Sequence, residues 1–71
     1  MNRERKILRI CQAHVAPGMS LIKWQEILAA YAVFPDDRGS WSAASDDQVN
    51  LIFEEIAGVV RTARADRKEV G

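Results

Sequence analysis

The sequence predicts an all-α protein, with a short N-terminal helix followed by a hairpin of two longer helices. Apolar residues recur at helical spacing in three segments. Residues suited to helix capping precede these segments, and proline and glycine separate them. At 71 residues, the chain (1–71) is expected to form one domain near the lower size limit for a self-sufficient hydrophobic core.

The first helix is expected over about residues 3–15. Ile7, Ile10 and Cys11 follow helical spacing, and Asn2 can cap the start. A Pro-Gly pair then ends the segment.

The second helix is expected over about residues 20–33, with Ser20 as its N-cap and Pro35 as its break. It is apolar around most of its circumference, so it must be covered on more than one side. It is therefore either the centre of a three-helix core or a surface for a second subunit or a partner protein. Its main stripe consists of Trp24, Ile27, Leu28 and Tyr31.

An acidic connection is expected over residues 34–45. Asp36 and Asp37 follow a proline and precede a glycine, which is ordinary turn chemistry. Trp41 has two possible roles, which the sequence leaves open. It either anchors a partner protein, as interface aromatic residues often do, or folds back as a lid over the helix pair.

The third helix is expected over about residues 46–65, followed by a frayed tail over 66–71. Ser45 and Gln48 have the spacing of a capping box. Gly58 lies in mid-helix, either to allow a close helix crossing or as a neutral position. The seam of this helix joins that of the second helix as a core or dimer seam, with Trp24, Ile27, Leu28, Val49, Phe53, Ile56 and Val60 as its residues.

Composition excludes several classes of function. With one cysteine and one histidine, the chain cannot form an internal disulfide, and a tetrahedral metal site is not expected. It contains no nucleophile–base, phosphate-loop or dinucleotide motif. We therefore expect no enzyme activity, no metal and no cofactor. No apolar run approaches the length of a membrane span, and the unpaired cysteine favours the cytoplasm.

Charge is balanced overall but unevenly distributed. The formal net charge is zero, yet both ends of the chain are basic and the middle is acidic. This pattern serves solubility and internal pairing, or steers the protein toward a charged partner.

Nucleic-acid binding by a helix-turn-helix domain is the alternative function. The helix that would read bases is mostly apolar and lacks the side chains that recognise base edges. Basic residues could instead contact phosphates. The candidates are Arg3, Arg5, Arg9, Arg61 and Arg64.

Protein binding is the function that the sequence favours. The second helix has excess apolar surface, and an aromatic residue interrupts the acidic connection. A homodimer through the second or third helix is expected, because chains this small often need a second subunit. The predicted partner-binding residues are Trp41, Tyr31, Phe34, Asp36 and Asp37.

In size, composition and lack of motifs, the chain resembles the small helical accessory proteins of temperate phages and mobile elements. That resemblance implies a protein that docks stoichiometrically on a host protein as an inhibitor, anti-activator or adaptor. Membrane attachment is not expected, because the apolar face of the first helix is needed by the core.

Overall fold

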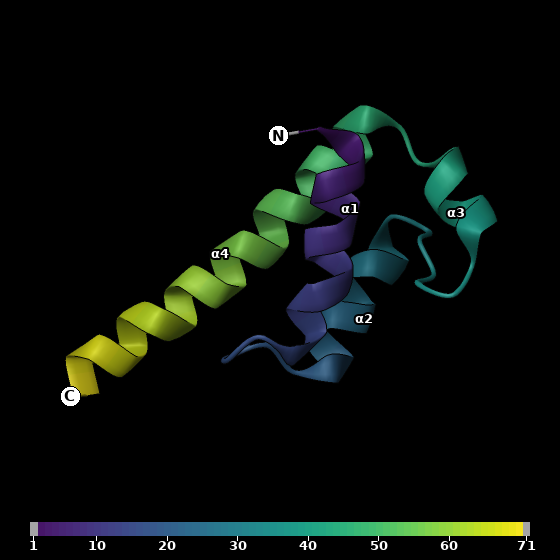
Figure 1. The fold of residues 1–71 in the computed structure, drawn as a ribbon. Coiled ribbons are helices and arrows are strands. Elements are labelled where there is room, and N and C mark those ends of the chain that lie inside the picture. Colours follow the sequence, from purple (N-terminus) through teal and green to yellow (C-terminus); the bar gives the residue numbers. More distant parts are fainter. Residues whose placement is uncertain (1, 71) are drawn as a thin grey trace.

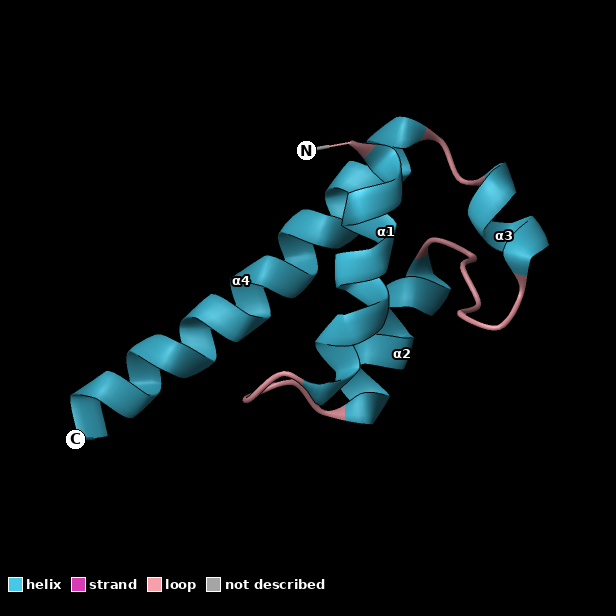
Figure 2. Ribbon diagram, viewed as in Figure 1, coloured by secondary structure: helices cyan, strands magenta, loops and turns pink. Residues whose placement is uncertain are grey.

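The structure is a computed structural model that describes residues 2–70, with side chains described for residues 2–65. This described part is all-α and contains no strand (Figures 1 and 2). No helix in it has both the length and the apolar character needed to cross a membrane. Its elements are α1 (Arg3–Gln12), the 3-10 turn η1 (Ala13–Val15), α2 (Leu21–Ala30), α3 (Arg38–Ala43) and α4 (Asp46–Val70).

The predicted helix starts are confirmed. Asn2 accepts a hydrogen bond from the Arg5 amide at 2.8 Å, and Ser20 accepts one from the Lys23 amide at 3.1 Å. The capping box before α4 forms in both directions, since the Gln48 amide donates to Ser45 Oγ at 3.1 Å and the Ser45 amide donates to Gln48 Oε1 at 3.0 Å. These caps are local, which is why the sequence predicts them.

The second helix ends earlier than predicted. Ala32 takes the left-handed conformation, with φ of 56°. The Val33 amide donates to the Leu28 carbonyl at 3.0 Å, and the Ala32 amide donates to the Ala29 carbonyl at 2.9 Å. These two bonds form a Schellman motif, which closes a helix and turns the chain away. Val33 is then buried in the core instead of continuing the helix.

The prediction that residues 34–45 form only a connection was wrong. They contain α3 (Arg38–Ala43), which is capped at its start by Asp37, whose Oδ1 accepts from the Gly39 amide at 2.9 Å. Glycine and serine give this segment little intrinsic helix preference. α3 forms because burial of Trp41 attaches it to the core.

The expected helix hairpin is also corrected. The main packing partner of α4 is α1, and α2 packs against α4 less extensively. α1 and α4 begin side by side and diverge toward their C-terminal ends (Figure 1). α4 continues to Val70, through positions where a frayed tail was predicted; Gly71, the last of them, lies outside the described residues.

The predicted seam residues belong to one core within the chain. Trp24, Ile27, Leu28, Val49 and Ile56 are buried, while Phe53 and Val60 are partly buried against them. The core is completed by Ile10 of α1, Trp41 of α3 and Ile52 of α4, together with three residues that lie between helices, namely Met19, Val33 and Ala44.

Of the two alternatives for Gly58, the structure favours the neutral position, and a close approach occurs instead at Gly18. Apart from its own helix backbone and chain neighbours, no described atom lies within 4 Å of a Cβ built on Gly58. A Cβ built on Gly18, whose φ is +86°, would overlap the side chain of Ala63. Glycine at position 18 therefore lets the turn between η1 and α2 pack directly on α4.

Candidate functional site

The predicted partner-binding residues do not form one exposed patch. Trp41 is only 8% exposed and belongs to the core, so its burial supports the lid interpretation. Tyr31 is partly buried and donates to Glu55 Oε1 at 2.9 Å. Phe34 is 55% exposed, and Asp36 and Asp37 are exposed beside it.

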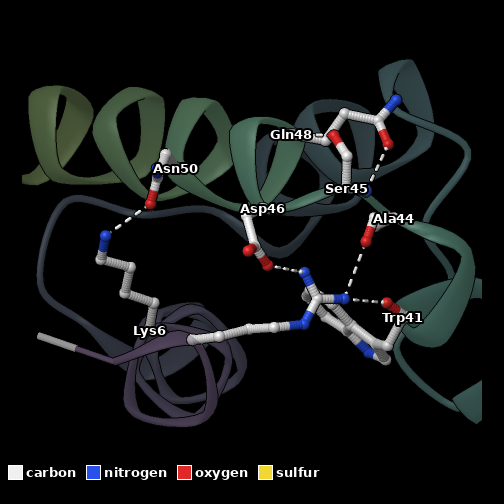
Figure 3. A network of polar contacts seen from close by, with 8 residues as sticks. Lys6, Trp41, Ala44, Ser45, Asp46, Gln48 and Asn50 are labelled. Atoms are coloured by element: carbon white, nitrogen blue, oxygen red, sulfur yellow. Dashed lines mark hydrogen bonds and ion pairs between the residues drawn. The ribbon is translucent and has the colours of Figure 1, made fainter.

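Arg3 is a structural residue. Its Nη2 donates to the carbonyl oxygens of Trp41 and Ala44, each at 2.7 Å, and its Nη1 pairs with Asp46 at 2.8 Å (Figure 3). One guanidinium thus donates to two carbonyl groups at the C-terminal end of α3 and pairs with a carboxylate at the start of α4. These contacts use three of its five N–H donors and fix the guanidinium against α3 and α4, which disfavours the phosphate contacts predicted for it.

A groove of about 550 Å³ lies between α1 and α4. Its apolar lining comes from both helices and from the turn after α1. Three arginines, one on α1 and two on α4, line it as well. The lining residues are Arg9, Ile10, Gln12, Ala13, Ala16, Phe53, Ile56, Ala57, Val60, Arg61 and Arg64.

Helical spacing and small side chains explain this groove. Phe53, Ile56 and Val60 recur at intervals of three and four residues, so they share one face of α4. Opposite them, the chain after α1 offers only Ala13 and Ala16. As the two helices diverge, alanine side chains are too small to fill the space between them, so Phe53 and Val60 stay partly exposed while Ile56 is buried.

The charged residues described in the lining of the groove are all positive. Arg9, Arg61 and Arg64 are exposed, and no aspartate or glutamate is among the described residues that line the groove. Among the described side chains, the one ion pair joins Arg3 to Asp46, outside the groove. The groove therefore suits a ligand with an apolar centre and acidic flanks.

Of the predicted nucleic-acid residues, three converge on this groove and two do not. Arg9, Arg61 and Arg64 line it, Arg3 is held at the other end of α1, and Arg5 is exposed outside it. The sequence predicted the large apolar residues of α4 that line the groove only as a core or dimer seam. It missed alanines 13, 16 and 57, which carry no functional signal of their own. Their role follows from the pairing of α1 with α4.

His14 and Cys11 adjoin the core and form no reactive pair. The His14 and Trp24 ring centroids are 5.0 Å apart, and His14 Nδ1 lies 2.6 Å from the Cys11 carbonyl oxygen. Burial raises the pKa of the Cys11 thiol, which disfavours the reactive thiolate. Among residues 2–65, no three metal-ligating side chains gather in one place.

Among the described side chains, the phenol of Tyr31 is the other group whose pKa is shifted. The hydrogen bond to Glu55 raises the pKa of Tyr31 most, followed by desolvation and by the negative charge of Glu55. This contact ties the end of α2 to α4, so Tyr31 has a structural partner within the chain.

No protein-family model matches the chain, and no significant match was found among curated proteins or solved structures.

Proposed function

We propose that the protein is a non-enzymatic, cytoplasmic protein-binding module that docks stoichiometrically on a partner through the groove between α1 and α4. It acts as an inhibitor, anti-activator or adaptor of the phage or mobile-element type. The observation that carries the proposal is the apolar groove with three arginines and no acidic residue among the described residues that line it. The partner segment that fits presents an apolar side chain between acidic residues.

This docking surface differs from the surface that the sequence favoured. Trp41 is buried, whereas the groove combines solvent-accessible apolar area with arginine, a residue enriched at interface hot spots. Arginine also recognises carboxylates through two parallel hydrogen bonds. Lys23 is the one basic residue of α2, so the helix expected to read DNA gives little support to the alternative function.

Capture from a nuclease-treated bacterial lysate tests the proposal. The groove variant, Arg61→Glu/Arg64→Glu, reverses two exposed charges that line the groove. The matched control, Arg5→Glu/Lys23→Glu, makes the same charge change at exposed positions outside it. We expect the wild type and the control to recover one protein in stoichiometric amount and the groove variant to lose it.

Equal recovery by the groove variant would rule out the groove as the docking surface. Recovery that disappears after nuclease treatment would favour nucleic-acid binding instead. Circular dichroism of each variant establishes that any loss reflects the surface and not the fold.

A further inference from the structure

The groove fits a segment that the same chain exposes elsewhere. Phe34 is a large apolar side chain left outside the core, at 55% exposure. Asp36 and Asp37 follow it and are exposed, and neither forms an ion pair with a described side chain. Residues 34–37 therefore present an aromatic ring and two carboxylates, the chemistry that the groove accepts.

Hydrogen bonds within the chain brace the backbone of this segment. The Asp37 amide donates to the Phe34 carbonyl at 2.9 Å, and the Phe34 amide donates to Ser40 Oγ at 2.9 Å. The Ser40 hydroxyl lies 2.8 Å from the Asp37 carbonyl oxygen, to which it donates. A preorganised segment loses little conformational entropy on docking.

The segment docks on another molecule more readily than on its own groove. It connects α2 to α3, whereas the groove lies between α4 and the C-terminal part of α1. In Figure 1, the α2–α3 connection lies to the right of the molecule and α4 runs away to the lower left. Each copy thus carries an acidic segment at one end and a basic groove toward the other.

We infer that residues 34–37 of each copy occupy the groove of a second copy, forming a two-fold dimer with two such contacts. This inference rests on the proposed function, because it assigns the same groove an occupant in the absence of a partner. A closed dimer uses both surfaces of both copies and covers apolar area that a chain of 71 residues leaves exposed. A docking partner must then displace the second copy.

The charges set the strength of the dimer. Arg38 is exposed next to the segment and offsets one of its two carboxylates. The contacts are open to solvent, so added salt weakens the dimer by screening them.

Charge exchange between the two contact surfaces tests the inference by analytical ultracentrifugation. The groove variant is Arg61→Glu/Arg64→Glu. The segment variant is Asp36→Arg/Asp37→Asn, in which asparagine keeps an oxygen to cap α3. We expect each variant alone to dimerise about a hundredfold more weakly than the wild type, because like charges then face each other.

An equimolar mixture of the two variants should recover the dimer. In the mixed pair, one contact is native and the other has both charges exchanged. A misfolded variant could not restore binding in this way, so recovery identifies the two surfaces as partners. The Arg5→Glu/Lys23→Glu control should dimerise as the wild type does.

A wild type that stays monomeric at high micromolar concentration would overturn the inference, and so would a mixture that stays monomeric. The proposed function is judged separately by capture. If the wild type is a monomer yet captures a partner through the groove, the proposed function is supported and the dimer is ruled out. If the mixture recovers the dimer but no partner is captured, the dimer is supported and the proposed function is not. The segment variant, whose groove is intact, should capture at least as much partner as the wild type.

Discussion

Trp41 holds a segment of low helix propensity in a helix. Its indole is buried in the core cluster, and its carbonyl oxygen accepts a hydrogen bond from Arg3 at 2.7 Å. Side chain and backbone thus attach α3 to α1 and to the core at the same point. The predicted recognition residue is in this way part of the fold, and its neighbour Phe34 is the aromatic residue left exposed.

Truncation of Trp41 should therefore reduce stability. We expect Trp41→Ala to lower the free energy of unfolding by about 3–5 kcal/mol, because it removes a buried indole and leaves a cavity. The control is Leu51→Ala, at an apolar position of α4 that is 53% exposed, which should change it by about 0.5 kcal/mol or less. Urea denaturation followed by circular dichroism measures both. Equal midpoints for the two variants would contradict the role of Trp41 as a lid.

Tyr31 gives a second prediction at the residue scale. Its pKa is raised, first by the hydrogen bond to Glu55. Since the folded state holds the phenol protonated, its contribution to stability is complete below the unfolded pKa, about 10. That contribution is lost as pH rises through the higher folded pKa. Tyr31 is the only tyrosine, so near-ultraviolet absorbance follows its ionisation alone. Glu55→Ala should lower the pKa toward its ordinary value, and an unchanged titration would show that the contact does not form.

At the scale of the elements, the end of α2 contains a residue under strain. Ala32 is left-handed at the position where helices most often place glycine. We expect Ala32→Gly to raise the free energy of unfolding by about 1 kcal/mol, because glycine removes the penalty on a left-handed Cβ. Ala29→Gly, at an exposed position within α2, should lower it by about 1 kcal/mol. Thermal unfolding of the two variants checks the opposite signs, and a loss at both positions would argue against the Schellman motif.

The N-terminal and C-terminal ends of α2 together show why helix starts were predictable from the sequence and helix ends were not. Ser20 caps α2 through a bond that spans three residues, so its signal is local. The end depends on Ala32 adopting an uncommon conformation while Val33 enters the core. Without glycine at position 32 the sequence carries no local stop before Pro35. α3 was missed for a related reason, since the contacts that hold it come from Arg3 and from the core.

At the scale of the whole molecule, the site depends on which helices pair. The sequence identified the core residues of α2 and α4 by their periodicity, and the structure places them in the core. It also identified Arg9, Arg61 and Arg64 as candidate phosphate-binding residues of the alternative function. It did not predict that α1 pairs with α4, because periodicity describes one face of a helix and not the helix that covers it. Only this pairing places the three arginines beside the apolar residues that line the groove.

The same charge distribution leads to a prediction about DNA. The net charge is zero, Arg3 is occupied within the fold, and the exposed carboxylates at the α2–α3 end repel phosphate. We therefore expect duplex DNA to bind with a Kd no tighter than about 10 µM at physiological salt, in the non-specific range. Fluorescence anisotropy across a salt series measures this, with Arg61→Glu/Arg64→Glu and Arg5→Glu/Lys23→Glu as the variant pair.

Sub-micromolar binding that prefers one DNA sequence and is lost in the groove variant would assign the groove to nucleic acid. Weak binding that both variants reduce equally would mean that DNA responds to overall charge, and would leave the groove to a protein.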